Sequence, residues 1–354
     1  MTLDIGGPVN VADFGGTGAA LLLVHGLGGS HLNWLSVAPQ LAEHHRVFAL
    51  DLPGFGRSPL AGRRSSIAAN VLVLTRAIPE LSDRPVVLMG NSMGGLLSIG
   101  VAATHPTLVR CLLLVDPAVP APGGWKPRFD RVTRNFLAAA LIPSWGARRV
   151  ARAVAALGPE SLVFETLRLC SADPSRIEQA VIDAHIALEA ERLAQPGWQE
   201  SFYAAARSLV RSLALKRQVM RWVRLVEAPT LLVQGDLDRL VSVQSARAIA
   251  SLRPDWEYHE FAGAGHVPMM EVPAEFLAVT GDWLARHAGE AAHAVPAGHE
   301  VDLLAKPAAQ AGARLGSLCP LGSRQVVRQR TLDPPFEGSS PSSPAKCCSP
   351  PADA

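Results

Sequence analysis

The sequence predicts an α/β protein, with a mostly parallel sheet, helices on both faces and an inserted helical cap. Three observations predict this class. Short apolar runs alternate with helix-length stretches over residues 9–116, the alternation resumes after residue 228, and the segment between shows only helical patterns. Apolar strands that alternate with helices indicate a parallel sheet that is covered on both faces.

The first half of the sheet is predicted from apolar runs of strand length. An amphipathic helix is expected over Ser65–Leu81, where apolar side chains recur every three or four residues. Another helix is expected to start at Gly95–Ile99. The runs expected to form strands are Val9–Phe14, Ala20–Val24, Arg46–Leu50, Val86–Met89 and Cys111–Val115.

The second half of the sheet is predicted to follow residue 228. The strands Thr230–Gln234 and Glu257–Phe261 are expected on either side of a helix over Val243–Leu252. A helix over Ala274–Ala288 is expected to close the sheet. Residues 1–117 and 227–288 are therefore predicted to form one core domain.

Residues 118–226 are predicted to form a helical cap, inserted after Cys111–Val115, which is the sixth strand when a short first strand at Met1–Ile5 is counted. Asp173-Pro174 is a favourable helix start, because aspartate caps a helix and proline suits its first position. That helix is expected to run toward Ala194, and a second amphipathic stretch covers Arg207–Val226. Because the cap roofs the expected pocket, we expect it to set substrate preference.

Residues 289–354 lose apolar periodicity and end in a serine- and proline-rich stretch. This tail is predicted to be mostly disordered, because such a composition buries too little apolar surface to fold. A docked segment around Leu315–Val327 and an out-of-frame extension are the alternatives.

Composition excludes several functional classes. The formal net charge of +2 over 354 residues predicts no nucleic-acid partner. No secretory signal opens the chain, and the longest apolar runs are too short to cross a bilayer. The five cysteines are scattered and form no disulfide framework, so a reducing cytoplasm is expected. No cluster of His, Cys and carboxylate residues has the spacing of metal ligands, so we expect no metal and no cofactor.

The motif Gly90-Asn91-Ser92-Met93-Gly94 lies between a predicted strand and a predicted helix. Gly-x-Ser-x-Gly in this setting is typical of a nucleophile elbow, a strained turn that exposes a serine hydroxyl at a helix N-terminus. Small flanking residues are needed because the turn is tight. Ser92 is therefore the candidate nucleophile.

A serine needs a histidine to take its proton and a carboxylate to orient that histidine. Asp236 and Asp238 follow the strand Thr230–Gln234, and His266 follows the strand Glu257–Phe261. All three lie at carboxyl ends of predicted parallel strands, the edge where sites form in such sheets. Serine, acid and histidine also occur in the chain order expected for this sheet type.

An oxyanion hole requires two backbone N–H groups directed at the developing negative charge. One is expected from Met93, directly after the nucleophile. The other is expected from Leu27, within the glycine-rich loop that follows the strand Ala20–Val24. His25 in that loop is interpreted as a structural residue that orients the loop, and not as the base.

With these motifs in order, the chain resembles the α/β-hydrolase superfamily over about residues 9–287. The resemblance favours Asp238 as the acid, and leaves Asp236 to cap the loop backbone. It also puts the first strand in doubt, because Met1–Ile5 is short for the family. The segments that carry it are His25–Gly28, Asp51–Ser58, Gly90–Gly95, Gly235–Val241 and Gly265–Pro268 with Glu271 and Pro273.

The resemblance implies a serine hydrolase that cleaves a carboxylic ester of a small apolar substrate through an acyl-enzyme. The alternative is a C–C bond hydrolase of aromatic ring-cleavage products, a group similar at Asn91 but usually carrying tryptophan where this chain has Val267. A cofactor-free perhydrolase, a thioesterase, an acyltransferase and a non-catalytic ligand-binding receptor are further possibilities on this scaffold.

Overall fold

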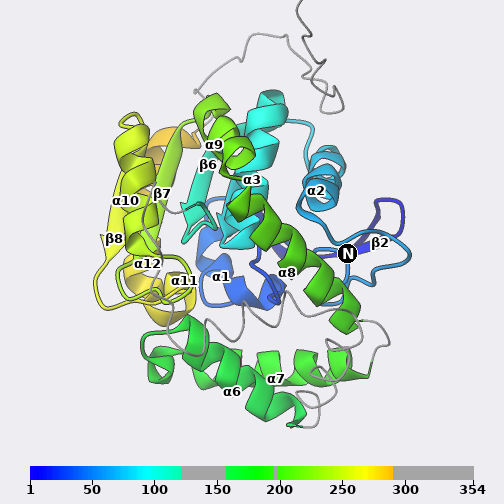
Figure 1. Cartoon of the computed structure of the whole chain (residues 1–354). Coiled ribbons are helices and arrows are strands. Elements are labelled where there is room, and N and C mark those ends of the chain that lie inside the picture. The colour runs from blue at the N-terminus through cyan, green and yellow to red at the C-terminus, as the bar shows by residue number, and fades with distance from the viewer. Residues whose placement is uncertain (121–156, 195–197, 290–354) are drawn as a thin grey trace, which may run out of the picture. The chain divides into compact units, whose positions relative to one another are not determined.

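A computed structural model of the protein describes residues 1–120, 157–194 and 198–289 (Figure 1). The chain divides into two units, Met1–Leu304 and Ala305–Ala354, and every described residue belongs to the first. The segment 121–156 of the expected cap and residues 290–354 of the expected tail lie outside the described residues. The alternative of a docked segment around Leu315–Val327 falls there too.

Eight strands form a single sheet in the order β1-β2-β4-β3-β5-β6-β7-β8. β1 and β2 pair antiparallel, β2 pairs antiparallel with β4, and the strands from β4 to β8 are parallel. The predicted mostly parallel sheet is thereby confirmed. The strands are β1 Thr2–Asp4, β2 Pro8–Gly15, β3 Ala20–Val24, β4 Arg46–Leu50, β5 Val86–Asn91, β6 Val109–Val115, β7 Thr230–Gly235 and β8 Glu257–Phe261.

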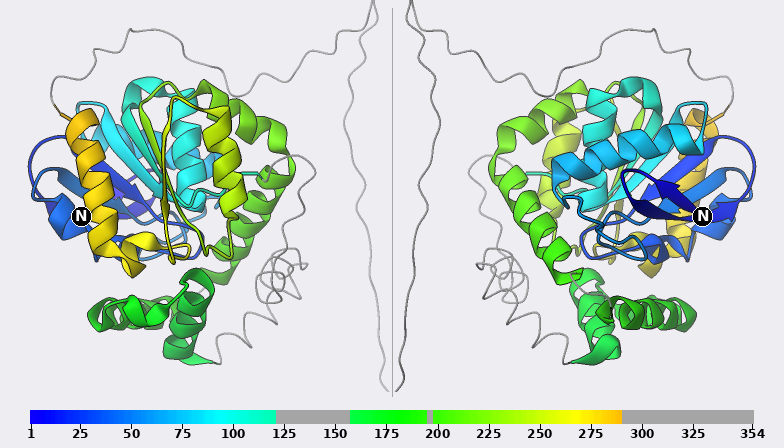
Figure 2. Two further views of the ribbon diagram at one scale, coloured as in Figure 1. Left: turned by 90° about the vertical axis from the view of Figure 1, so that its left-hand side faces the viewer. Right: turned by 90° about the vertical axis from the view of Figure 1, so that its right-hand side faces the viewer.

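Helices lie on both sides of the sheet (Figure 2). The core helices are η1 His31–Trp34, α1 Ala38–Leu41, α2 Ile67–Leu81, α3 Met93–Thr104, η2 Pro106–Leu108, α10 Val243–Leu252, α11 Pro268–Glu271 and α12 Pro273–His287. Between β6 and β7 the described helices are α6 Gly158–Cys170, η3 Pro174–Arg176, α7 Gln179–Leu193, α8 Trp198–Ala214 and α9 Lys216–Leu225.

Strand alternation builds one apolar core on each face of the sheet. Leu22 and Val24 of β3 belong to a buried cluster with residues of α2, α3, α9 and α10. Leu21 and Leu23 of the same strand belong to a second cluster, with residues of η1, α1, α6, α7 and α12. Successive side chains point to opposite faces of a strand, so a fully apolar run supplies both cores at once.

The two strands that precede the candidate site lie at a reversal of strand order. β3 lies between β4 and β5, and Val24 pairs with Gly90 at the carboxyl ends of β3 and β5. The next strand in the chain, β4, therefore lies on one side of β3, and the strand after it, β5, lies on the other side. In open α/β sheets, ligand sites form at the carboxyl ends of strands at such a switch point.

The helices between β6 and β7 differ in detail from the predicted ones. Asp173 caps only the short helix η3, because its carboxylate bonds the Ser175 backbone and hydroxyl in a tight turn, and α7 begins six residues later. The amphipathic stretch predicted over Arg207–Val226 is divided between α8 and α9, which meet at Leu215. Figure 1 shows α6 and α7 side by side, and these helices contact each other closely.

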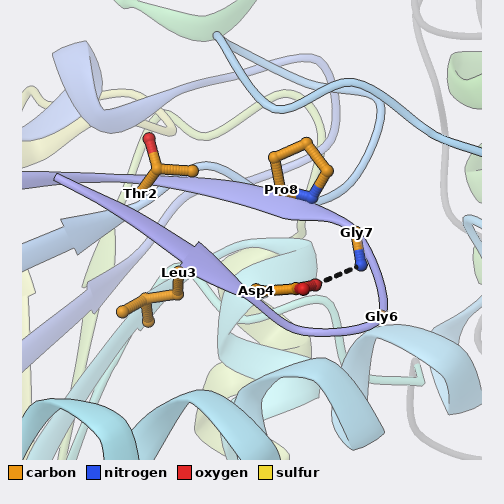
Figure 3. Close-up of a pocket in the computed structure, with 6 residues that line it drawn as sticks. All are labelled: Thr2, Leu3, Asp4, Gly6, Gly7 and Pro8. Atoms are coloured by element: carbon orange, nitrogen blue, oxygen red, sulfur yellow. Dashed lines mark hydrogen bonds between the residues drawn. The ribbon is translucent and has the colours of Figure 1, made fainter.

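The N-terminal stretch forms β1 and a hairpin with β2, which extends the sheet at its antiparallel edge. Figure 3 shows a pocket at this hairpin, where Asp4 accepts a hydrogen bond of 2.8 Å from the Gly7 N–H. None of the residues lining it belongs to the candidate site. Within the described part of the chain, no helix combines the length and apolar character required to cross a bilayer.

Candidate active site

Ser92 forms the turn between β5 and α3. Its backbone has φ +53° and ψ −117°, a conformation that residues with a side chain rarely adopt. Two hydrogen bonds of 2.9 Å hold it there, from the Ser92 N–H to the Val115 carbonyl and from the Ala118 N–H to the Ser92 carbonyl. The end of β6 therefore fixes the turn.

The glycines around Ser92 leave no room for a side chain. A Cβ added to Gly94 would lie 2.3 Å from the Val24 carbonyl oxygen, and one added to Gly90 would lie 2.4 Å from the Gly94 carbonyl oxygen. Both contacts are far shorter than a van der Waals separation, and both involve backbone atoms. Only glycine lets α3 start this close to β3.

The loop after β3 packs directly on the serine turn. A Cβ on Gly26 would lie 3.0 Å from the Ser92 Cβ. Leu27 is the next residue of this loop, and Met93 is the first residue of α3. The two residues expected to form the oxyanion hole therefore belong to two segments that meet at Ser92.

His25 is buried and both of its ring nitrogens are engaged. Nδ1 donates to the Gly26 carbonyl at 2.7 Å, and Nε2 accepts from the Leu52 N–H at 3.0 Å. This pairing requires the neutral ring, and burial lowers the pKa of His25 from 6.5 to about 4. His25 thus ties the loop after β3 to the loop after β4, the structural position expected for it.

His266 and Asp238 are in direct contact. The His266 Nδ1 lies 2.7 Å from Asp238 Oδ2, and both side chains are almost fully shielded from solvent. Asp238 Oδ1 accepts from the backbone N–H groups of Leu240 and Val241 at 2.7 and 3.0 Å. Because Nδ1 faces a carboxylate, it carries the proton, which leaves Nε2 as the basic nitrogen.

Asp236, the competing acid, lies elsewhere. It is exposed, and its carboxylate accepts a hydrogen bond of 2.7 Å from the Gly263 N–H. It therefore ties the loop after β7 to the loop after β8. The structure brings Asp238 to His266, and not Asp236.

Asn91 connects the serine turn to the histidine loop. Its side-chain nitrogen donates to the His266 carbonyl at 3.0 Å and to the Val115 carbonyl at 3.2 Å. Both amide protons are therefore used on backbone oxygens. Asn91 thereby joins the segments that carry Ser92 and His266.

Glu271 joins the histidine loop to the helices between β6 and β7. Its buried carboxylate accepts from the Gly265 N–H at 2.8 Å, and from the N–H groups of Ala172 and Asp173 at 3.2 and 2.8 Å. The His266 N–H also donates to the Cys170 carbonyl at 2.6 Å. The last residue of α6 and the segment after it therefore hold the loop in place.

α7 and α8 reach the loop after β3. Arg192 of α7 donates to the Gly28 carbonyl at 3.2 Å. A Cβ on Gly28 would lie 3.1 Å from the Phe202 ring of α8. The segment expected to supply an oxyanion donor is therefore packed under described helices of the predicted cap.

A second carboxyl group, which is not among the site residues predicted from the sequence, lies near this pair. Asp116 is fully buried directly after β6 and accepts hydrogen bonds from Gln234 Nε2 at 2.8 Å and from the Gly235 N–H at 2.9 Å. Burial, and then the charge of Asp238, raise the pKa of Asp116 well above its ordinary value. Its position after an apolar strand was the available signal, the same one that pointed to Asp238.

Polar atoms of Asp116, Asp238 and His266 lie within 4.8 Å of one another. The His266 Nδ1 carries a proton bound to Asp238, so it has no lone pair for a metal ion. An imidazole oriented by a carboxylate suits proton transfer, and Asn91, the residue before Ser92, bonds the His266 carbonyl at 3.0 Å.

The chain is similar in sequence and fold to known hydrolases. The family model described as alpha/beta hydrolase fold matches residues 19–273. The chain is 27% identical over 77% of its length to 2-hydroxy-6-oxo-6-(2'-aminophenyl)hexa-2,4-dienoic acid hydrolase of Metapseudomonas resinovorans, covering 86% of that protein. It is 29% identical over 72% of its length to a pimeloyl-[acyl-carrier protein] methyl ester esterase of Klebsiella pneumoniae, covering 90% of that protein.

Among solved structures, the chain resembles a thermophilic esterase from Thermogutta terrifontis. The TM-score is 0.60 at 25% identity, and the match covers 79% of this chain and 94% of the esterase. The relatives thus include enzymes named for ester cleavage and an enzyme named for hydrolysis of a dienoic acid.

Proposed function

This chain belongs to the α/β hydrolase fold family, and from that premise we propose that it is a serine hydrolase that cleaves carboxylic esters through an acyl-enzyme on Ser92. That it is a hydrolytic enzyme follows from the family and from the hydrolases among its relatives. The observation that carries the serine mechanism is the 2.7 Å contact between His266 and Asp238 at the sheet edge where Ser92 forms its strained turn.

In the proposed reaction, the Ser92 hydroxyl attacks the ester carbonyl and His266 Nε2 takes its proton. The tetrahedral intermediate collapses, the C–O bond breaks, and the alcohol leaves with the proton from Nε2. Water then attacks the acyl-enzyme by the same route, which releases the acid and restores Ser92. Asp238 stabilises the imidazolium formed in each half-reaction.

Leu27 and Met93 are proposed to donate their backbone N–H groups to the oxyanion. Met93 opens α3, where backbone N–H groups are directed at the site and the helix dipole favours negative charge. The close packing of Gly26 on Ser92 supports a donor from the neighbouring loop. Donors positioned for the tetrahedral oxygen lower the barrier because they act most strongly in the transition state.

Ester cleavage is favoured over C–C cleavage by Asn91 and Val267. Both amide protons of Asn91 are used on backbone carbonyls, so none is left for a substrate. Val267 also stands where ring-cleavage hydrolases usually carry a tryptophan. C–C hydrolysis remains the second candidate because one relative is named as a dienoic acid hydrolase.

The substrate is proposed to be a small apolar ester. Phe202 of α8 packs against the loop after β3. Val119 is a buried apolar residue, and it directly follows Ala118, whose N–H bonds the Ser92 carbonyl. Apolar side chains on the segments that pack around the serine turn favour an uncharged acyl chain.

The first experiment is labelling with a fluorophosphonate probe, which reacts with activated serines. Wild-type protein is expected to be labelled and Ser92→Ala to be unlabelled. Ser98→Ala is the matched control, because Ser98 lies on α3, directly after the Ser92 turn, and its hydroxyl donates to the Gly94 carbonyl. A folded wild-type protein that remains unlabelled would contradict the proposal and favour a binding role.

The second experiment compares two substrates, p-nitrophenyl butyrate and a ring-cleavage dienoate. The proposal predicts turnover of the ester with a higher kcat/KM, and loss of that turnover in Ser92→Ala. Preferred turnover of the dienoate would instead assign the chain to C–C hydrolysis, with the same nucleophile.

A further inference from the structure

We propose that Asp116 holds a proton in the working enzyme and donates it in a hydrogen bond to Asp238, so that His266 is backed by a carboxylic acid–carboxylate pair. This inference deepens the proposed function and rests on it. It makes Asp116 a positioning residue, because it acts on His266 only through Asp238.

The backbone conformation of Asp116 is fixed by its position directly after β6. It follows β6 directly, its N–H donates to the Val233 carbonyl at 2.9 Å, and its φ is +46°. Aspartate tolerates this left-handed conformation better than most residues. The side chain is thereby held between the ends of β6 and β7, behind Asp238.

The two oxygens of Asp116 have different surroundings. Oδ1 accepts from Gln234 Nε2 and from the Gly235 N–H. Oδ2 is buried and, in the described part of the chain, no donor lies within hydrogen-bond distance of it. An ionised carboxylate would leave that oxygen buried without a partner, at a substantial cost in free energy.

Protonation resolves this mismatch. A proton on Oδ2 turns it into a donor, and the nearby acceptor is Asp238, which has a carboxylate oxygen within 4.8 Å of one of the Asp116 oxygens. Gln234 Nε2 donates to both acids, at 2.8 Å to Asp116 and at 3.0 Å to Asp238. The amide and the shared proton therefore join the two carboxyl groups.

The charges that face Asp116 also favour its protonated form. Asp238 lies on the loop after β7, Glu271 on α11 and His266 on the loop after β8. Both acids disfavour a further negative charge on Asp116, since like charges in a buried site cannot all ionise at low cost. Of the two carboxyl groups of the Asp116–Asp238 pair, Asp238 therefore carries the charge, and it bonds the imidazole directly.

The test uses two variants of the full chain. Asp116→Asn keeps an acceptor for Gln234 and Gly235, offers an N–H to Asp238, and suits the left-handed backbone. Asp116→Gly removes the side chain at a backbone position that glycine adopts freely. We expect kcat/KM of Asp116→Asn to stay within about threefold of wild type, and that of Asp116→Gly to fall about 10- to 100-fold, as for loss of a hydrogen bond to a charged group.

Two readouts separate this proposal from a merely structural role. In infrared difference spectra at neutral pH, the carboxylic-acid C=O band of wild type is expected to vanish in Asp116→Asn. In pH–rate profiles, the pKa of the catalytic base is expected to be unchanged in Asp116→Asn. Absence of the band, or a lowered pKa of the base in that variant, would mean that Asp116 is ionised and would overturn the proposal.

The infrared measurement needs no turnover. If wild-type protein fails the fluorophosphonate test yet shows the band, the serine mechanism fails while the protonated Asp116 stands. If the serine is labelled and the band is missing, the serine mechanism stands while the protonated Asp116 fails.

Discussion

At the scale of single residues, backbone strain is concentrated at the candidate site. In the described part of the chain, three residues other than glycine have positive φ, and two of them are Ser92 and Asp116. They follow the neighbouring strands β5 and β6 at one sheet edge. Such strain is retained where the surrounding structure over-determines it, which is common at functional sites.

The neighbouring carboxylates Asp236 and Asp238 provide a matched pair of variants. Asp238→Asn is expected to lower kcat by about 10⁴-fold, because the His266 tautomer needed for catalysis loses its acceptor. Asp236→Asn changes an exposed group that bonds the Gly263 N–H, and is expected to alter kcat less than about threefold. Steady-state kinetics on an ester, with circular dichroism as a folding control, measure both. Equal losses would contradict the assignment of Asp238.

At the scale of elements, close backbone packing at the start of α3 shapes the site. α3 contacts β3, β5 and β6, and all of its residues are buried. The helix is therefore buried on all sides and gives little amphipathic signal. The sequence marks this element mainly by its glycines, which the approach to β3 requires.

Two glycine-to-alanine changes test that packing. Gly94→Ala places a Cβ 2.3 Å from a backbone oxygen, so it is expected to destabilise the fold by at least about 3 kcal/mol and to abolish probe labelling. Gly281→Ala, inside α12, meets no atom within 4 Å and is expected to stabilise the protein by about 0.5–1 kcal/mol. Urea unfolding measures both. A soluble, fully labelled Gly94→Ala would show that the turn tolerates a side chain.

Glu271 tests the link between the histidine loop and the segment after α6. Glu271→Gln replaces one acceptor oxygen by an NH₂ group that faces backbone donors, so a loss of about 1–3 kcal/mol of stability is expected, together with a lower kcat. Glu275→Gln is the control, because Glu275 is half exposed on α12, and its change is expected to stay within about 0.5 kcal/mol. If both variants behave alike in urea unfolding, Glu271 does not hold the loop.

At the scale of the whole molecule, the carboxyl edge of the sheet gathers distant segments. Ser92, Asp116, Asp238 and His266 each follow a different strand, and β5 to β8 are neighbours in the sheet. Loops from four points along the chain therefore meet in one place. Stability of the whole fold and integrity of the site are consequently linked.

Acid stability follows from buried His25. Its pKa is about 4 in the folded protein against 6.5 ordinarily, so the unfolded chain binds the extra proton between these values. The contribution of His25 to the free energy of unfolding is therefore fully present above pH 6.5, and about 3 kcal/mol of it is expected to be lost as pH drops to 4. His45 and His185, whose pKa values burial also lowers, add in the same direction.

A comparison with His25→Asn isolates this contribution. The variant is expected to be less stable at neutral pH, because the Leu52 N–H loses its acceptor. Its free energy of unfolding should nevertheless fall by about 3 kcal/mol less than that of wild type between pH 6.5 and 4. Urea unfolding across this range measures the difference. Parallel pH dependences would show that His25 is not the titrating group.

The sequence alone determined the strands from β2 to β8, the mostly parallel sheet and the loops that carry Ser92, Asp238 and His266, but left the first strand in doubt. These rest on local patterns: apolar runs of strand length, turn glycines and residues placed directly after strands. Only the tertiary structure decided which aspartate meets His266, how Asn91 and Glu271 join separate loops, and that α8 and α9 meet at Leu215. It also revealed Asp116, which looks like an ordinary strand-end residue in the sequence. Those features depend on contacts between residues far apart in the chain, which no local pattern encodes.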